Sequence, residues 1–123
     1  MTIFPVTEST ISARDLGQFL KERYDLSEKT TCRLFRTGMN HLYFVTDGDR
    51  KFVFRIYTFN WRTKMDVAEE LRLLTHLKQN NASVSYPLTD KRNELIQDIN
   101  APEGKRYGVL FSFAIHSVSY NAA

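Results

Sequence analysis

One arginine stands in the middle of an apolar run, and two glutamates follow it in the next segment of the chain. Arg55 interrupts KFVFRIYTF, which otherwise has the composition of a buried strand, and Glu69 and Glu70 lie in DVAEELRLLTHL. A guanidinium taken out of water is costly unless an anionic group meets it. We therefore expect Arg55 to meet one of these glutamates, a bound anion or solvent.

Three strands and a helix position these groups. TTCRLFRTG, HLYFVTDGDR and KFVFRIYTF are rich in β-branched and aromatic residues, and DGD indicates a tight turn between the second and the third. Sequential antiparallel pairing is the economical topology for such neighbours. The next helix is expected over roughly residues 63–80, with apolar residues at helical spacing. These residues are Val67, Leu71, Leu74 and Leu77.

Further elements flank this group. STISARDLGQFLKERYDLS predicts a leading helix, with Ser12 as its N-cap and Asp15 in a capping-box-like position. Its apolar stripe consists of Leu16, Phe19, Leu20 and Tyr24. NELIQDI and RYGVLFSFAI predict two more strands, joined by the turn NAPEGK. The sequence therefore predicts an α+β domain: a five-stranded, mostly antiparallel sheet, an N-terminal helix, and one helix between the third and fourth strands.

The composition is that of an ordinary globular domain. The 123 residues suit one domain, and 42% are hydrophobic while 25% are charged. A net charge of +3, with the basic residues scattered among acids, indicates no nucleic-acid partner. The single cysteine, Cys32, excludes an internal disulfide and fits a reducing compartment. With no signal-peptide pattern and no apolar run of membrane-spanning length, the expected location is the cytoplasm, without a membrane partner.

Taken in order, these segments resemble the N-terminal lobe of the kinase-like small-molecule phosphotransferases, the group of aminoglycoside phosphotransferases, choline kinases and type II homoserine kinases. The resemblance runs from about Phe4 to Ala114. Its carriers are the leading helix, RTGMNHLYFV between the first two strands, KFVFRIY, DVAEELRLLTHL, and YGVLFSFA before the interlobe hinge. It implies a kinase-like N-terminal lobe over residues 1–114 and a divergent tail over residues 115–123.

The resemblance implies an ATP site on this lobe. In the family a basic residue on the third strand holds the α- and β-phosphates, and a helix glutamate holds that residue in place. The matching residues are Arg55 and Glu70, with Glu69 as the second choice and Asp66, one turn earlier, also able to face the strand. Arginine offers phosphate a bidentate fork, so it suits this role.

The same resemblance implies two backbone contacts with the nucleotide. The amides of Gly38, Met39, Asn40 and His41 would approach phosphate, and Asn40 would tolerate an unusual backbone angle. The adenine edge would meet the Ser112 carbonyl and the Ala114 amide, with Phe111 at the back of the pocket and Val53 and Leu42 over the ring.

Each of these groups also has a plainer interpretation. Arg55 would be a surface arginine on a half-exposed strand face shared with Val53 and Tyr57, and one glutamate would lie on a solvated helix face. The loop would be an ordinary hairpin loop, and LFSFA a core strand. The isolated histidines, His41, His76 and His116, lack metal-ligand spacing and are expected at the surface or at caps.

The resemblance ends where the family's chemistry begins. The catalytic aspartate, the magnesium ligands and the acceptor pocket lie in a larger second lobe, whereas here IHSVSYNAA follows Ala114. This abrupt change indicates a chain that is shortened, frameshifted or diverged at its end. We expect an N-lobe without turnover of its own, with Mg²⁺ bound only if a C-lobe is supplied.

The alternative is a non-catalytic interaction module or remnant. Its uncovered apolar face, or YGVLFSFAIHSVSY continuing as an edge strand, would then pair with a second copy to form a homodimer.

Overall fold

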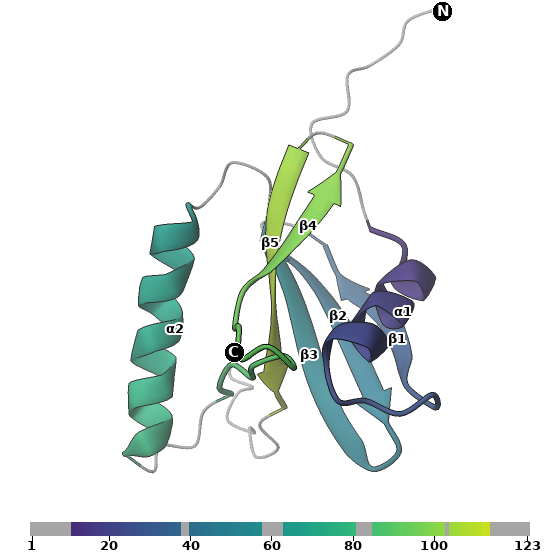
Figure 1. Cartoon of the computed structure of the whole chain (residues 1–123), viewed down its shortest axis with the longest axis horizontal. Coiled ribbons are helices and arrows are strands. Elements are labelled where there is room, and N and C mark those ends of the chain that lie inside the picture. Colours follow the sequence, from purple (N-terminus) through teal and green to yellow (C-terminus); the bar gives the residue numbers. More distant parts are fainter. Residues whose placement is uncertain (1–10, 38–39, 58–62, 81–84, 103, 114–123) are drawn as a thin grey trace, which may run out of the picture.

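The computed structural model of the chain describes residues 11–37, 40–57, 63–80, 85–102 and 104–113 (Figure 1). Its elements are α1 (Ala13–Arg23), β1 (Thr31–Arg36), β2 (Asn40–Asp47), β3 (Arg50–Tyr57), α2 (Lys64–Gln79), β4 (Gln97–Ala101) and β5 (Gly104–Ser112). The strands form one antiparallel sheet in the order β1-β2-β3-β5-β4. The predicted α+β domain, with one helix between the third and fourth strands, is confirmed.

Both helices begin where the sequence predicts. Ser12 Oγ accepts a hydrogen bond from the Asp15 N–H at 3.2 Å. Thr63 Oγ1 accepts one from the Asp66 N–H at 3.1 Å, and Asp66 accepts in turn from the Thr63 N–H at 3.3 Å, which completes a capping box. α2 ends at its cap residue Asn80, so the helix expected over residues 63–80 is confirmed.

The fourth strand starts later than NELIQDI predicts. It begins at Gln97, because a turn precedes it. The Asp90 carboxylate accepts hydrogen bonds from the N–H groups of Arg92 at 2.8 Å and Glu94 at 3.0 Å, and Asn93 takes a φ of 65°. The Gln97 amide then donates to Asp90 at 2.9 Å, which fixes the start of β4.

β5 lies inside the sheet and not at its edge. It pairs with β3 on one side; on the other it pairs with β4 and then with a short segment before β4. In that segment Pro87 bridges Phe111, and the Ser112 N–H donates to the Tyr86 carbonyl at 2.9 Å. The predicted exposed edge strand is therefore wrong for residues 107–112, and residues 114–120 lie outside the described part. β1 and β4 are the edges.

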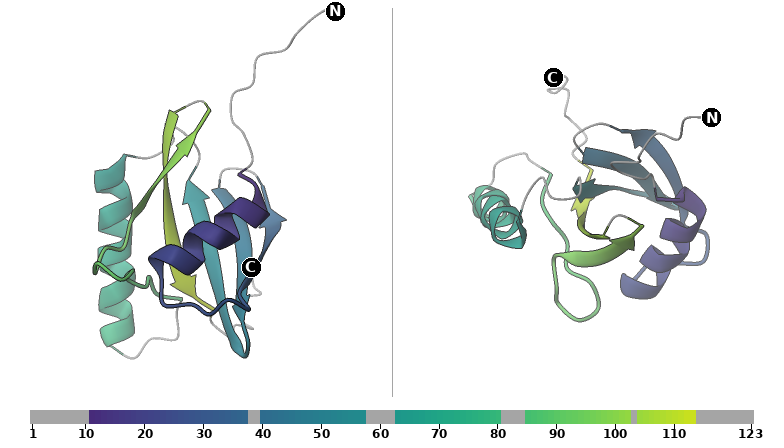
Figure 2. Two further views of the ribbon diagram at one scale, coloured as in Figure 1. Left: turned by 45° about the vertical axis from the view of Figure 1, so that its right-hand side comes forward. Right: turned by 90° about the horizontal axis from the view of Figure 1, so that it is seen from above.

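α1 closes one face of the sheet (Figure 2). Leu16, Leu20 and Tyr24 pack against side chains of β2 and β3. The strand residues beneath them are Tyr43, Val45, Phe54 and Ile56. None of these seven side chains is more than 3% exposed, so this face is the main hydrophobic core.

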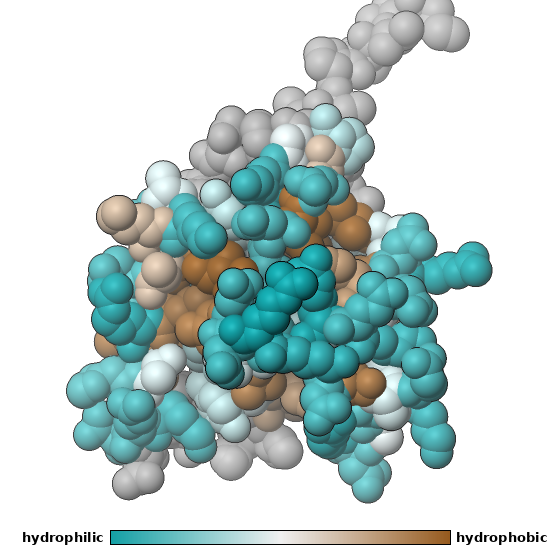
Figure 3. Space-filling model, in the orientation of Figure 1, coloured by the Kyte–Doolittle hydropathy of each residue, from teal (hydrophilic) through white to brown (hydrophobic). Residues whose placement is uncertain are grey.

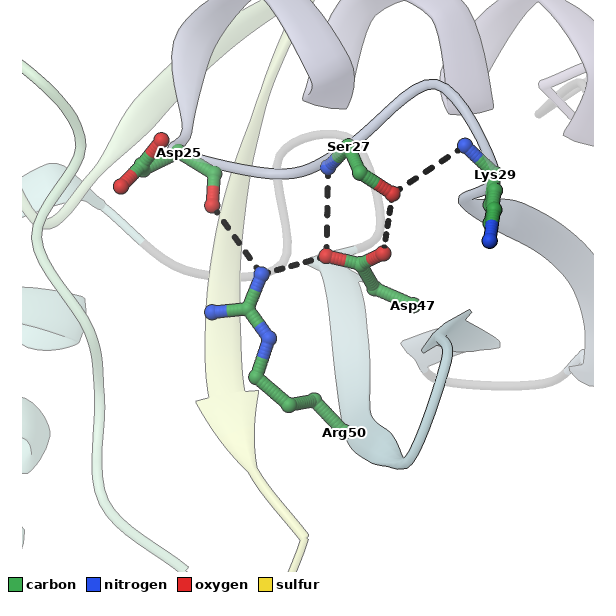
Figure 4. A network of polar contacts seen from close by, with 5 residues as sticks. All are labelled: Asp25, Ser27, Lys29, Asp47 and Arg50. Atoms are coloured by element: carbon green, nitrogen blue, oxygen red, sulfur yellow. Dashed lines mark hydrogen bonds and ion pairs between the residues drawn. The ribbon is translucent and has the colours of Figure 1, made fainter.

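A polar network ties the loop after α1 to the β2–β3 hairpin (Figure 4). The Asp47 carboxylate accepts hydrogen bonds from the Ser27 hydroxyl, the Ser27 N–H and the Arg50 guanidinium. Arg50 also donates to the Asp25 carbonyl at 3.2 Å, and the Lys29 N–H donates to Ser27 Oγ at 3.1 Å. The hydrogen bonds from Ser27, and then Arg50, lower the pKa of Asp47 to about 2.

α2 covers only part of the opposite face. Its buried side chains are Val67 and Leu71, which pack with Tyr57, Val109 and Phe111. An open groove lies between the helix and the segment leading into β4, and Figure 3 shows hydrophobic side chains gathered beside the helix there. The part of this face that α2 leaves uncovered, on β2 and β3, carries the candidate site.

Candidate functional site

Arg55 is paired with Glu70. Its Nη1 donates to Glu70 Oε2 at 3.0 Å, and the two side chains are 29% and 27% exposed. Glu69 pairs instead with Arg72 on the outer side of α2, where both side chains are more than half exposed. Of the helix acids considered from the sequence, the structure thus joins Glu70 to β3, while Asp66 caps the helix.

Two aromatic rings complete the surroundings of this guanidinium. The Cζ of Arg55 lies 4.9 Å from the centroid of the Phe111 ring and 5.7 Å from that of Tyr57. Such contacts hold a cation against a ring face. Its Nε is buried and has no hydrogen-bond acceptor among the described residues. A carboxylate and two rings thus position the group, and the bond to Glu70 engages only Nη1 of its three nitrogens.

The register of the sheet shows which side chains share a face with Arg55. Leu42 and Val109 lie opposite it on the neighbouring strands, and Phe44 and Phe111 lie opposite Val53 in the next row. α2 covers the β5 members of these rows, while the β2 and β3 members stay half-buried. We call the uncovered set the open face: Leu42, Phe44, Val53 and Arg55.

Three aromatic rings meet at the open face. The rings of Phe35 and Phe44 stack with centroids 4.3 Å apart, and Phe113 meets Phe44 edge-on at 6.2 Å. Sequence reasoning assigned neither Phe35 nor Phe44 to the site. Strand alternation was an available signal for Phe44, because it places that residue on the same face as Leu42 and Arg55.

Some of the other predicted site residues are described by the structure and some are not. Gly38, Met39 and Ala114 lie outside the described residues. Asn40 begins β2 without a positive φ; among the described non-glycine residues only Asn93 has one.

His41 lies elsewhere than expected, and Ser112 is held by the segment that precedes β4. His41 is 1% exposed, so its expected surface position is wrong: it follows Asn40 within β2, opposite buried Ile56. The Ser112 hydroxyl accepts from the Tyr86 N–H at 3.0 Å, which ties this end of β5 to the preceding segment. A role for its carbonyl stays a prediction.

A buried arginine supports the strand that carries Arg55. Arg106 is 1% exposed, and its Nε donates to the Tyr57 carbonyl at 3.0 Å, at the end of β3. Sequence reasoning missed this contact, because Arg106 stands at the start of a predicted strand, where an arginine is usually exposed. It fixes the chain two residues after Arg55.

The described residues offer neither a metal-ligand cluster nor an activated thiol. Within the described ranges no group of three or more His, Cys, Asp or Glu residues is arranged to hold a metal ion. Burial raises the pKa of Cys32 to about 11, which keeps the thiol protonated near neutral pH, as expected for a small hydrophobic residue. Neither helix in the described part is long and apolar enough to cross a membrane.

Comparison with known proteins settles the family. The sequence profile of the phosphotransferase enzyme family matches residues 31–110, which is more than half of the chain. The chain belongs to the phosphotransferase enzyme family. The matched range includes Arg55, Glu70 and the open face, and the resemblance to the N-lobe of these enzymes is confirmed.

Two curated relatives come from two different bacteria. An uncharacterized protein of Synechocystis sp. is 33% identical over 111 residues, which cover 90% of this chain and 31% of the relative. One of Deinococcus radiodurans is 32% identical over 110 residues, covering 89% of this chain and 32% of the relative. The chain thus spans about a third of the length of the curated relatives that it matches.

Solved phosphotransferases share the fold. The microcompartment-associated aminopropanol kinase superposes with a TM-score of 0.69 and 20% identity, over 81% of this chain and 31% of that one. An amicoumacin kinase in complex with AMP-PNP, Ca²⁺ and Ami gives 0.69 and 18%, over 85% and 32%. Spectinomycin phosphotransferase in complex with ADP and spectinomycin gives 0.65 and 15%, over 88% and 31%. The chain therefore has the fold of a kinase-like N-lobe.

Proposed function

We propose that this chain is the nucleotide-binding N-lobe of a small-molecule phosphotransferase, and that Arg55 holds the phosphates of ATP. The observation that carries the proposal is the Arg55–Glu70 ion pair at the border of the open face. Two solved relatives in fold were determined with AMP-PNP or ADP, which supports a nucleotide as the ligand. We assign the lobe to residues 1–114, the tail to residues 115–123, and the location to the cytoplasm.

The state of Arg55 suits a phosphate ligand. A guanidinium carries five N–H donors, and Glu70 takes only the Nη1 side of it. Phosphoryl transfer depends mainly on positioning and on stabilising negative charge, so a cation already held in one orientation needs little reorganisation when phosphate arrives. Glu70 is then a positioning residue: it fixes the direction of the fork and does not itself touch the nucleotide.

The open face suits the rest of the nucleotide. Phe44 and Val53 lie one row beyond Leu42 and Arg55, on the side of the sheet where β5 runs toward Ser112. An apolar surface beside a fixed cation fits a molecule with a flat base at one end and phosphates at the other. The predicted backbone contacts, from Gly38 to His41 and at Ser112 and Ala114, would then hold the phosphates and the base edge.

We further propose that the 123-residue chain binds nucleotide without transferring phosphate. About two-thirds of the length of its curated relatives lies beyond the match. A base for the acceptor hydroxyl, carboxylates for Mg²⁺ and the acceptor pocket would be supplied there. Metal-dependent phosphate transfer by the purified chain would contradict this part of the proposal.

A titration followed by NMR tests the binding. Backbone amides of the labelled chain are recorded against ATP, with and without Mg²⁺. Shifts gathered at Asn40, Arg55 and Ser112, and weakened at least tenfold in affinity by Arg55→Ala, are expected. Arg72→Ala is the matched control, because Arg72 pairs with Glu69 away from the open face. Shifts that survive Arg55→Ala, or none at millimolar ATP, would overturn the assignment.

The second candidate function is self-association, and edge strand β1 favours it. Leu34 and Phe35 on this edge are 37% and 46% exposed, and an exposed edge can pair with another chain. A homodimer formed this way would show a concentration-dependent mass in light scattering, and Leu34→Lys would abolish it. Only monomer at high concentration would exclude this candidate.

A further inference from the structure

Phe35 sits in a β-bulge. Leu34 pairs with Tyr43 and Arg36 pairs with Leu42, so Phe35 between them has no residue opposite it. A bulge changes the direction of the side chain that it carries. Here the ring of Phe35 lies on the open face, although its neighbour Leu34 is in register with a residue of the α1 core.

The ring that Phe35 covers belongs to the candidate site. Phe35 and Phe44 stack with a centroid distance of 4.3 Å and an interplanar angle of 29°. A separation this small leaves no room for a third ring between them. Phe35 is 46% exposed, and the guanidinium of Arg36 lies 5.5 Å from its ring centroid. The contact therefore joins Phe44, on the interior strand β2, to the half-exposed Phe35 on the edge strand β1.

A nucleobase bound at this site would need the same ring. Phe44 lies opposite Val53, and Val53 precedes Arg55 by two residues, about 7 Å along the strand. With phosphate on Arg55, a ribose bridges this distance and brings the base to Phe44. Bases bind aromatic side chains by stacking on their faces. The base and Phe35 therefore compete for Phe44.

We propose that Phe35 is a specificity-determining residue of the nucleotide site: its ring stacks on Phe44 when the site is empty and leaves it when a base binds. Phe35 thus weakens the binding of nucleotides and leaves the binding of base-free phosphate chains unchanged. This inference rests on the proposed function, since it takes Arg55 as the phosphate contact. It adds a competition between Phe35 and the nucleobase for the ring of Phe44, which does not involve the Arg55–Glu70 ion pair.

Two ligands and three variants test it. The wild-type chain, Phe35→Val, Phe35→Tyr and Leu34→Val are each titrated with ATP and with tripolyphosphate, which has no base. Valine keeps the strand preference and removes the ring, whereas tyrosine keeps the ring. Phe35→Val should bind ATP roughly two- to tenfold more tightly, the factor that one ring–ring contact represents. Its affinity for tripolyphosphate should not change, and Phe35→Tyr and Leu34→Val should match the wild type.

The outcomes separate this inference from the proposed function. If tripolyphosphate and ATP bind through Arg55 but Phe35→Val leaves ATP affinity equal or lower, only the competition is wrong. If no variant binds either ligand, both fall together. A measurement on the wild-type chain does not depend on the variants folding: nuclear Overhauser contacts between the two rings should disappear with ATP and persist with tripolyphosphate. Persistence in both cases would overturn the inference.

Discussion

The two faces of the sheet are built from the same strands but are covered very differently. On the α1 face, Tyr43 and Phe54 are fully buried beneath the helix. On the other face, Phe44 and Val53, their neighbours in sequence, stay half-buried, and Arg55 is 29% exposed. Strand alternation creates both faces equally. The difference therefore comes from the helices and not from the strands.

The placement of the two helices explains why one face of the sheet is buried more completely than the other. α1 crosses the strands obliquely, whereas α2 stands to one side of the sheet (Figure 2). Only Val67 and Leu71 of α2 are buried, although the helix has 16 residues. One face of the sheet is therefore closed by α1, whereas α2 covers only part of the other. Stability and binding should consequently respond to different substitutions.

The largest expected effect is loss of a ring on the α1 face. Phe54→Ala should reduce the free energy of unfolding by about 3–5 kcal/mol, because it empties a fully buried position. Phe44→Ala removes the same ring from the open face and should cost about 1 kcal/mol, since that ring is already partly in water. Urea denaturation of both variants measures the difference. Equal costs would mean that the two faces are equally part of the core.

A smaller effect is expected where the α1 core meets β5. A Cβ at Gly108 would lie 2.5 Å from Cζ of Phe54, so Gly108→Ala must displace the ring. We expect a loss of about 1–3 kcal/mol in the free energy of unfolding, the usual cost of overpacking. Gly17→Ala is the control. Its Cβ would meet Cβ of Cys32 at 3.2 Å, a milder contact than the one at Gly108, and alanine favours the helix, so its loss of stability should be smaller. A Gly108→Ala chain as stable as the wild type would show that the Phe54 ring can move aside at little cost in free energy.

Acid should weaken the polar network on the α1 side. Hydrogen bonds from Ser27 and Arg50 lower the pKa of Asp47 from 3.8 to about 2 in the folded chain. Because the folded pKa is the lower one, the carboxylate stabilises the fold above about pH 4 and loses this contribution as the pH falls toward about 2. Asp47→Asn should therefore lower stability at pH 7 and flatten its decline between about pH 4 and pH 2.

Ser27→Ala is the matched variant for this network. It removes the hydroxyl donor while leaving the carboxylate in place, so part of the decline with acid should remain. Denaturation curves across the pH range measure both variants. An Asp47→Asn chain with the wild-type slope would mean that other carboxylates cause the acid sensitivity.

Much of the fold could be predicted because its signals are local. The cap at Ser12, the start of α2 near residue 63 and the turn DGD each depend on a few adjacent residues, and all three form as expected. The pair between Arg55 and a helix acid was also foreseeable, and the family resemblance favoured Glu70, the acid that the structure joins to Arg55. Helical spacing alone left Glu69 and Asp66 as alternatives. Which acid faces the strand depends on the rotation of α2 about its axis, which Val67 and Leu71 set by packing on the sheet.

The remaining features depend on contacts between distant segments. The bulge at Phe35 has no sequence signature, since one unpaired residue becomes visible only once β1 and β2 are in register. Burial of Arg106 requires the end of β3 beside β5, and burial of His41 requires the α1 face. The interior position of β5 likewise depends on β4 returning beside it. The candidate site was therefore predicted at Arg55, Glu70 and Phe111 and missed at the stacked rings of Phe35 and Phe44.

The smallest expected effect distinguishes a positioning pair from an ordinary surface pair. In a double-mutant cycle of Arg55→Leu and Glu70→Gln, the coupling should be about 0.5–1 kcal/mol, because both side chains are roughly three-quarters buried. The Arg72–Glu69 pair on the outside of α2 should give less, about 0.3 kcal/mol, since water surrounds it. Urea denaturation measures both cycles. Equal coupling energies would mean that Glu70 stabilises Arg55 no more than Glu69 stabilises the exposed Arg72. If Glu70 positions Arg55, Glu70→Gln should weaken ATP binding by a smaller factor than Arg55→Leu, which should weaken it at least tenfold.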